Sequence, residues 1–286
     1  MIFEKNMGDL KRALNNLGVR KGDILYISSD IKTFLFNIVI EYGIESKKDR
    51  DLVLNALVDE FQAIVGKEGT LLFPVFSWDW CRGKGFDIKM TKGEVGTLSN
   101  WVLKNRMDFT RTKHPIYSFM VWGKDSEYLK NMDNQDAWSH SSPFYYLQEC
   151  KAKQLLFNIE AFQGLTFGHY IEQEVGVPYR HSKYFFGEYT NEKGIIEYRM
   201  YSMFVRDVDL DVQCGIHNDW LIENNVASRE EWEGNLMTVV DLEKSYHVIR
   251  KDMLENNGKN TLRFAEGRLD WSKKQTIPYE IKGIGV

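Results

Sequence analysis

The sequence contains little cysteine and no long apolar run. Three cysteines occur among its 286 residues, namely Cys81, Cys150 and Cys214. They are far apart and odd in number, which argues against a disulfide framework or a zinc site and suggests a reducing compartment. No apolar run approaches the roughly 18 residues of a membrane span, and the chain does not begin like a signal peptide. We therefore expect a cytoplasmic protein that does not contact a membrane.

The sequence also lacks an excess of basic residues. The 37 Lys and Arg residues are outnumbered by 41 Asp and Glu residues, which gives a net charge of −4. This balance argues against binding to the nucleic-acid backbone, which needs a basic face. Neither a Gly-x-Gly-x-x-Gly sequence nor a Walker sequence occurs. We find no repeat and no linker, so residues 1–286 are expected to form a single domain. An acidic protein of this size is often a homodimer.

Strand and helix patterns alternate along much of the chain. This alternation predicts an α/β fold, a mixed central sheet with parallel members and flanking helices. Two further strands and a helix then predict an antiparallel C-terminal extension. The predicted strands cover 22–29, 69–76, 116–121, 153–159, 184–189 and 196–205, and the predicted helices include 51–65 and a segment near 236–254.

The most informative stretch of the sequence runs from Thr166 to Glu172. It follows an apolar run and Gly164, a pattern typical of a strand and a turn that lead into a helix. On a helix, His169 and Glu172 lie on one face because they are three residues apart. A carboxylate beside an imidazole orients the ring and fixes its tautomer, as a general base requires. The alternative is a surface histidine beside a solvated glutamate.

Five stretches, in order along the chain, resemble the aminoglycoside 3-N-acetyltransferase family, also called the antibiotic N-acetyltransferases. The resemblance implies a mixed α/β sheet flanked by helices, and acyl transfer from acyl-coenzyme A to an amine. The family usually has Ser where Thr112 stands, and the last hundred residues match only loosely. The five stretches are 22–29, 69–74, 96–119 (with the run Thr110-Arg-Thr-Lys-His-Pro115), 142–147 and 166–172.

The resemblance and the residue chemistry together predict the catalytic and cofactor-binding residues. His169 is the expected base and Glu172 its partner, while Thr112 or backbone N–H groups near Thr166 would stabilise the thioester oxygen. His140 is a second candidate base, and His114 before Pro115 is expected to be structural. Serines at the end of a strand can cap a helix or bind anions. The predicted coenzyme A contacts are Ser28, Ser29, Arg111, Thr112 and Ser142, with no metal cofactor.

An amino-sugar acceptor would need aromatic and charged contacts. Trp78 and Tyr179 could stack on a ring, and Asp209 could bind an ammonium group, although core packing and an exposed acidic edge are the simpler interpretations. Arg82 lies in an aromatic-rich loop with Lys84, which would suit a nucleotide diphosphate.

These expectations favour an N-acyltransferase that acts on a small amino-sugar molecule. We expect a nucleotide-linked (dTDP-type) amino-deoxysugar used in surface polysaccharide. One alternative is an aminoglycoside 3-N-acetyltransferase that confers antibiotic resistance. The others are a non-catalytic relative that binds coenzyme A or a sugar, and a metal-dependent hydrolase built on His and Asp residues.

Overall fold

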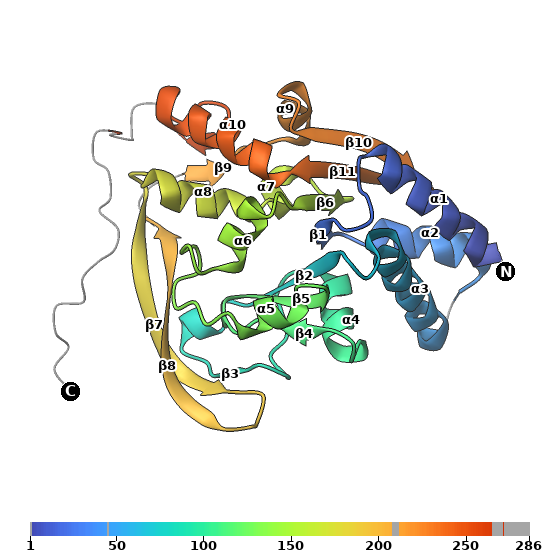
Figure 1. Cartoon of the computed structure of the whole chain (residues 1–286), viewed down its shortest axis with the longest axis horizontal. Helices are drawn as coiled ribbons and strands as arrows, with labels where there is room; N and C mark the ends of the chain where they lie inside the picture. Colours follow the sequence, from blue (N-terminus) through green and yellow to red (C-terminus); the bar gives the residue numbers. More distant parts are fainter. Residues whose placement is uncertain (1, 45, 208–211, 265–270, 272–286) are drawn as a thin grey trace.

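The computed structural model describes residues 2–44, 46–207, 212–264 and 271. A seven-stranded mixed sheet runs through the molecule in the order β10-β11-β6-β1-β2-β5-β4 (Figure 1). Its strands are β1 Ile24–Ser29, β2 Thr70–Phe76, β4 Thr110–Arg111, β5 Tyr117–Gly123, β6 Lys153–Phe157, β10 Ala227–Trp232 and β11 Asn235–Asp241.

The three central strands are parallel. β1 pairs in parallel with β2 on one side and with β6 on the other, so that Ser29 is level with Phe157. The outer strands β5, β4, β11 and β10 all join in antiparallel fashion. The carboxyl ends of β6, β1 and β2 therefore lie at one edge of the sheet, the edge where open α/β sheets bind ligands.

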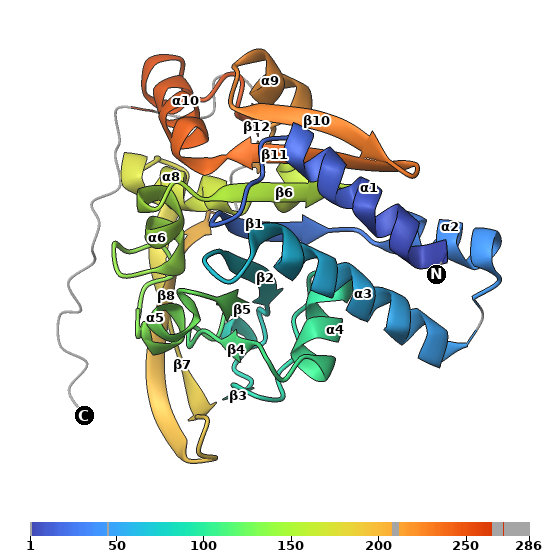
Figure 2. The ribbon, with the colours of Figure 1, turned by 45° about the vertical axis from the view of Figure 1, so that its right-hand side comes forward.

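Helices cover both faces of the sheet (Figure 2). Alternate residues of β1 point to opposite faces, so Leu25 and Ile27 pack in one apolar core and Tyr26 in the other. The first core is covered by α1 Ile2–Asn16, α2 Lys32–Tyr42, α3 Lys47–Val65 and α4 Thr97–Asn105. The second is covered by α5 Ser126–Asn131, α6 Pro143–Glu149, α8 Phe167–Val175 and α10 Leu242–Glu255.

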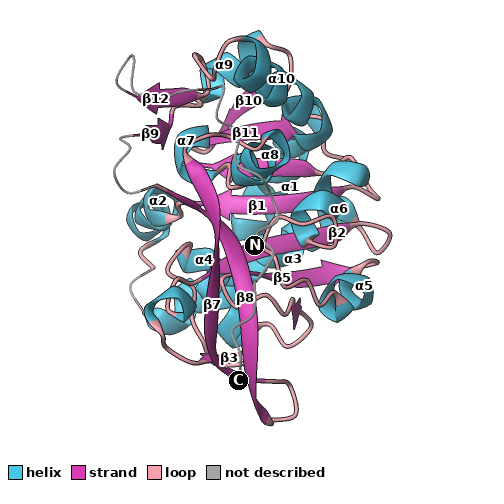
Figure 3. Ribbon diagram, turned by 90° about the vertical axis from the view of Figure 1, so that its left-hand side faces the viewer, coloured by secondary structure: helices cyan, strands magenta, loops and turns pink. Residues whose placement is uncertain are grey.

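A long hairpin forms a smaller sheet beside the central one. β7 Arg180–Thr190 and β8 Ile196–Arg206 form a long antiparallel hairpin, to which the short β3 Phe86–Asp87 adds in parallel. In Figure 3 the hairpin runs across the direction of the central strands. The remaining elements are η1 Trp80–Arg82, α7 Ala161–Gly164, β9 Val212–Cys214, α9 Asn218–Glu223 and β12 Leu262–Phe264.

The predicted mixed α/β architecture is confirmed, but the helix expected near 236–254 is wrong in its first part. Residues Asn235–Asp241 form β11, between β10 and β6, and the helix begins only at Leu242. Two local features set this boundary. Gly234 makes a tight turn with a φ of 70°, and the Asp241 side chain caps α10 by accepting from the Lys244 backbone N–H at 3.0 Å. Within the described residues, no helix has both the length and the apolar character to cross a bilayer.

Arg111 on β4 ties a loop to the sheet. Its Nε donates to Ser118 Oγ at 3.0 Å, and its Nη1 donates to the carbonyls of Ile88 and Thr91 at 3.0 and 2.7 Å. The guanidinium also lies over the Phe86 ring, 4.8 Å from its centroid. Burial lowers the pKa of Arg111 to about 10. The structure thus uses Arg111 to hold residues 88–91 against the sheet, whereas the sequence predicted a coenzyme A contact.

We expect Arg111→Lys to lower the free energy of unfolding by roughly 3 kcal/mol, since lysine cannot reproduce a buried fork of donors. Urea unfolding measures this loss. Lys113→Met is the matched control, because this neighbouring cation makes one exposed contact to a carbonyl and should shift stability by less than about 0.5 kcal/mol. Unchanged stability in Arg111→Lys together with weakened coenzyme A binding would restore the cofactor role.

Candidate active site

A cavity of about 300 Å³ lies at the carboxyl edge of the parallel strands. β1 contributes residues from Tyr26 to its end, β2 contributes Pro74 and Phe76 with Trp78 just beyond it, and the connection from β6 to α8 contributes a further group. β5 is antiparallel, so it contributes its first residue. The lining residues are Tyr26, Ser28, Ser29, Pro74, Phe76, Trp78, Val95, Gly96, Tyr117, Ile159, Gln163, Gly164, Thr166 and His169.

His169 and Glu172 meet as the sequence predicts. Both lie on α8, and His169 Nδ1 is 2.6 Å from Glu172 Oε2. The imidazole is 31% exposed and lines the cavity, whereas the carboxylate is only 5% exposed. This arrangement places the carboxylate behind the ring, so that the ring separates it from the cavity.

Glu172 is held by two groups that the sequence interpretation did not assign to it. Tyr179 Oη donates to Glu172 Oε1 at 2.8 Å. Arg180 Nε lies 2.7 Å from Glu172 Oε2, as an ion pair rather than an aligned hydrogen bond. Burial would raise the pKa of Glu172, but Arg180, His169 and Tyr179 together lower it to about 2. The carboxylate is therefore ionised at every pH at which the protein would be assayed.

The ionised carboxylate fixes the tautomer of the imidazole. An atom 2.6 Å from a carboxylate oxygen must be a donor, so Nδ1 carries a proton and donates it to Glu172. Nε2 is then the unprotonated nitrogen of the neutral ring. The Trp138 ring packs against the imidazole edge-to-face, with centroids 5.8 Å apart, and limits its rotation. The pair has the geometry of a general base and its orienting carboxylate.

Three hydroxyl residues on β1 face the cavity or border it. Ser28 Oγ donates to the Gly164 carbonyl at 3.3 Å and accepts from Gln154 Nε2 at 2.9 Å. Ser29 Oγ and Tyr26 Oη are buried and have no hydrogen-bond partner among the described residues. Burial raises the pKa of Tyr26 to about 12, although nearby Ser28 and Thr166 oppose the increase. Ser29 and Tyr26 both line the cavity.

Sequence reasoning singled out Ser28 and Ser29 but missed Tyr26. Tyr26 precedes Ser28 by two residues, so a strand places both side chains on one face. That spacing was the available signal, and an aromatic residue inside an apolar strand concealed it.

Two of the predicted cofactor contacts have structural partners instead. Thr112 Oγ1 is buried and accepts from the Phe119 backbone N–H at 2.9 Å. Ser142 caps α6 by accepting from the Tyr145 N–H at 3.4 Å. Neither residue lines the cavity. The Thr112 hydroxyl therefore supports the strand pairing, and the Ser142 hydroxyl caps the helix.

The predicted acceptor contacts divide in the same way. Trp78 lines the cavity. Tyr179 is fully buried and positions Glu172, so it does not offer a face for stacking. Arg82 Nη2 pairs with Asp79 at 2.9 Å and also contacts Glu94. Asp209 lies outside the described residues.

The other two candidate histidines do not reach the cavity. His114 is buried, and its Nδ1 accepts from the backbone N–H groups of Ile116 and Tyr117 at 3.3 and 3.2 Å, a structural role as expected. His140 is exposed at 65%, and its Nε2 lies 3.1 Å from Glu174 Oε1.

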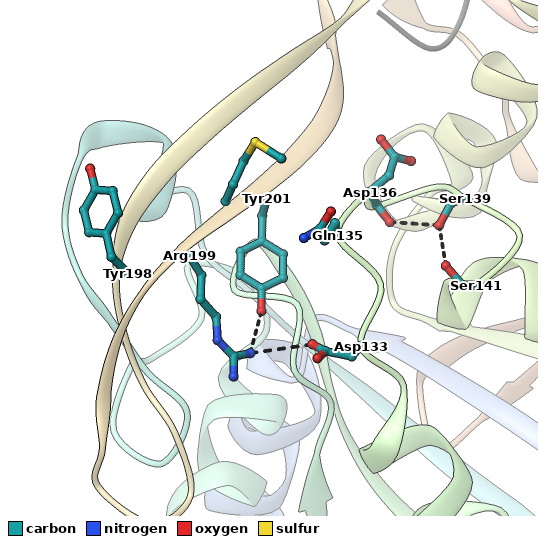
Figure 4. A pocket seen from close by; sticks show the side chains of 9 residues that line it. Asp133, Gln135, Asp136, Ser139, Ser141, Tyr198, Arg199 and Tyr201 are labelled. Atoms are coloured by element: carbon teal, nitrogen blue, oxygen red, sulfur yellow. Dashed lines mark hydrogen bonds and ion pairs between the residues drawn. The ribbon is translucent and has the colours of Figure 1, made fainter. Parts of the chain in front are cut away.

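A second, larger cavity of about 730 Å³ lies between β8 and the segment 133–141 (Figure 4). Arg199 and Tyr201 point from β8 toward Asp133, whereas the Tyr198 side chain projects to the other side of the strand, and Asp133 and Asp136 are the acidic residues of the lining. Its other lining residues are Gln135, Ser139, Ser141 and Met200.

The segment 133–141 also connects this second cavity to His169. Asp136 Oδ1 accepts from Gln173 Nε2 on α8 at 2.8 Å, and Trp138 packs on the imidazole. The segment therefore lines the second cavity and contacts the His169 helix, but no residue lines both cavities.

Comparisons with known proteins agree with this geometry. The sequence profile described as aminoglycoside 3-N-acetyltransferase matches residues 45–253. No curated protein sequence matches the chain. The solved structure of aminoglycoside acetyltransferase AAC(3)-Xa superposes with a TM-score of 0.69 at 15% identity, covering 89% of this chain and 93% of that one.

Two further solved structures show the same fold. The YokD protein from Bacillus subtilis gives a TM-score of 0.68 at 18% identity, with coverage of 89% of this chain and 95% of that one. AAC-IIIb, whose structure is a binary complex with CoASH, gives 0.65 at 16% identity, with coverage of 86% and 96%.

The profile match covers well over half of the chain, and the structural matches confirm the mixed α/β fold. The family resemblance seen in the sequence is thereby confirmed, and with it an enzyme that uses acyl-coenzyme A as the donor for N-acetyl transfer. The chain belongs to the aminoglycoside 3-N-acetyltransferase family.

Proposed function

We propose that this enzyme acetylates an amine of an aminoglycoside-type amino sugar, with His169 as the general base. The observation that carries the proposal is the 2.6 Å contact between His169 and ionised Glu172, whose imidazole lines the cavity at the carboxyl edge. Glu172 acts through His169 by orienting it.

Proton transfer is the part of the reaction that falls to these two residues. An amine is mostly protonated at neutral pH and must lose a proton before it can attack a carbonyl carbon. Because Nδ1–H donates to Glu172, Nε2 is the atom of His169 that accepts this proton. The ionised carboxylate then stabilises the imidazolium, as in other base–carboxylate pairs.

The cavity also offers donors for a developing negative charge. Acetyl-coenzyme A, when bound, supplies a thioester whose carbonyl oxygen gains charge during attack. Tyr26 and Ser29 place unpaired buried hydroxyls in the same cavity as His169, and so they fit an acceptor oxygen. The raised pKa of Tyr26, about 12, keeps its hydroxyl protonated. We assign this donor role to Tyr26 and Ser29, in place of the Thr112 hydroxyl.

The charges of the Trp78 loop favour an aminoglycoside over a sugar nucleotide. The expectation of a nucleotide-linked acceptor depended on Arg82 and Lys84. In the structure Arg82 pairs with Asp79 and Glu94, and Lys84 pairs with Asp79 at 2.8 Å. A diphosphate would have to displace these carboxylates. The family match supports the same alternative.

The second cavity suits the rest of such an acceptor. Its 133–141 segment also contacts His169 through Trp138. Asp133 is exposed at 58%, so its carboxylate is accessible to an ammonium group even though it also lies 3.6 Å from Arg199. Tyr198 is exposed at 75% and is the aromatic residue of the lining that can contact a sugar ring. We place the polyamine rings along this cavity.

The first test is thiol release from acetyl-coenzyme A with gentamicin-type amines and with nucleotide-linked amino sugars. We expect turnover with the aminoglycoside, and a fall in kcat of about 10² to 10⁴-fold in His169→Ala. His140→Ala is the matched control, because it removes a second imidazole–carboxylate pair that does not line the cavity. Undiminished turnover in His169→Ala would refute the base role, and turnover with sugar nucleotides alone would refute the acceptor.

Tyr26→Phe should lower kcat by about 10²-fold without loss of stability, because the deleted hydroxyl has no hydrogen-bond partner among the described residues. Tyr189→Phe is the control, and the opposite pattern of effects is expected for it. It removes a hydroxyl that donates to the Lys113 carbonyl at 3.0 Å, so it should cost about 1 kcal/mol of stability and leave kcat unchanged. Steady-state kinetics and urea unfolding measure both effects. Unchanged kcat in Tyr26→Phe would remove Tyr26 from the mechanism.

Asp133→Asn should raise KM for the aminoglycoside about threefold, the effect of one accessible ion pair, and leave KM for acetyl-coenzyme A unchanged. Asp219→Asn on α9 neutralises another exposed aspartate, one paired with Arg229, and should change neither KM. An Asp133→Asn enzyme with wild-type acceptor KM would show that the polyamine does not lie along the second cavity.

A further inference from the structure

Arg180, the first residue of β7, lies against both members of the His169–Glu172 pair. Its Nε is 2.7 Å from Glu172 Oε2, and its Nη2 is 3.1 Å from His169 Nδ1. Nothing in the reaction proposed above uses this guanidinium. The inference that follows rests on the proposed role of His169 as a base.

The position of the imidazole proton decides what the contact with Arg180 means. Nδ1 donates its proton to the ionised Glu172, so it has no lone pair to accept a hydrogen bond from Arg180. The guanidinium thus lies beside an N–H group rather than an acceptor. This contact is tolerable while the ring is neutral and becomes repulsive when the ring gains a second proton.

Arg180 is held in this position by the hairpin. Its Nη1 donates to the Phe204 carbonyl on β8 at 3.1 Å, and its side chain is only 12% exposed. The guanidinium carbon also lies 6.0 Å from the centroid of the Tyr179 ring. A buried cation that is fixed on three sides exerts a constant field on the imidazole.

The tyrosine and cysteine side chains around the pair carry no charge near neutral pH, and the His181–Asp207 ion pair follows Arg180 in the hairpin. Burial raises the pKa of Tyr117 on β5 and of Tyr26 on β1 to about 12, and that of Cys214 on β9 to about 11. Burial and the neighbouring carboxylate raise the pKa of Tyr179 well above its ordinary value. Among the groups that the described residues place at the pair, Glu172 and Arg180 therefore carry the charge.

These two charges act on the imidazole in opposite directions. A buried carboxylate alone would favour the imidazolium form, which has no free nitrogen and cannot act as a base. The adjacent cation offsets this effect while leaving the Nδ1–H to carboxylate hydrogen bond in place. Glu172 can then orient the His169 imidazole while the imidazole stays neutral in the resting enzyme.

We propose that Arg180 is a positioning residue that keeps His169 neutral and base-competent in the resting enzyme by balancing the charge of Glu172. The ion pair also holds in place the carboxylate oxygen that accepts the hydrogen bond from Nδ1–H. The hairpin thus contributes directly to the catalytic site through its first residue.

The test compares the pH dependence of kcat/KM in Arg180→Met, Arg180→Lys and the wild-type enzyme. We expect the acid limb of the Arg180→Met profile to move to higher pH by about one unit, with most activity recovered at high pH. Arg180→Lys keeps the cation and should keep the wild-type acid limb, even if kcat falls. Arg180→Gln is the second neutral variant, to be used if Arg180→Met does not fold.

Arg206→Met is the matched control. Arg206 is directly opposite Arg180 in the hairpin register and is exposed, and its guanidinium binds the Val212 carbonyl. Its removal deletes the same charge and a similar length of side chain from the neighbouring strand. We expect no displacement of the acid limb in this variant.

An NMR titration of the His169 ring, with His169→Ala used to assign its signals, separates this proposal from the acyl-transfer assignment because it needs no substrate. An imidazole that takes up its proton at higher pH in Arg180→Met than in the wild type supports the proposal. An unchanged titration, or an acid limb that stays at its wild-type position in both neutral variants, overturns it. If the imidazole responds while His169→Ala retains its activity, the charge balance stands and the assignment of His169 as the base fails.

Discussion

The parallel register of β6, β1 and β2 is the constraint on which the rest of the site depends. It brings three carboxyl ends to one edge of the sheet, so that the hydroxyls of β1, the Trp78 loop and the His169 helix surround one cavity. Segments more than a hundred residues apart become neighbours in this way. An antiparallel centre would place consecutive ends on opposite edges and would separate Ser29 from His169.

The His169–Glu172 pair illustrates how a buried charge is made tolerable. A carboxylate that is 5% exposed would be costly without partners, and here Arg180, Tyr179 and the imidazole surround it. Two of these partners come from the start of the β7–β8 hairpin. The hairpin thus stabilises the ionised form of Glu172 and closes the rear of the site. Its other strand, β8, forms a wall of the second cavity.

The distribution of paired basic residues bears on the substrate. Arg111 is occupied by backbone carbonyls, and Arg82 and Lys84 are occupied by Asp79 and Glu94. Each was a reasonable anion-binding candidate by residue type alone. These basic residues are therefore occupied, whereas the Asp133 carboxylate in the second cavity is 58% exposed. This distribution of charge suits a polycationic acceptor.

The sequence by itself determined the α/β class, the family and the His169–Glu172 pair, because these depend on local periodicity, on ordered motifs and on three-residue spacing along one helix. It did not determine that Asn235–Asp241 would form a strand, since a place beside β6 overrides an apolar pattern compatible with a helix. Nor did it place Arg180 beside Glu172 and Tyr26 in the cavity lining, or give Arg111 and Thr112 their buried partners. Only the tertiary structure decided those positions, because pairing and burial depend on which distant groups the sheet brings together.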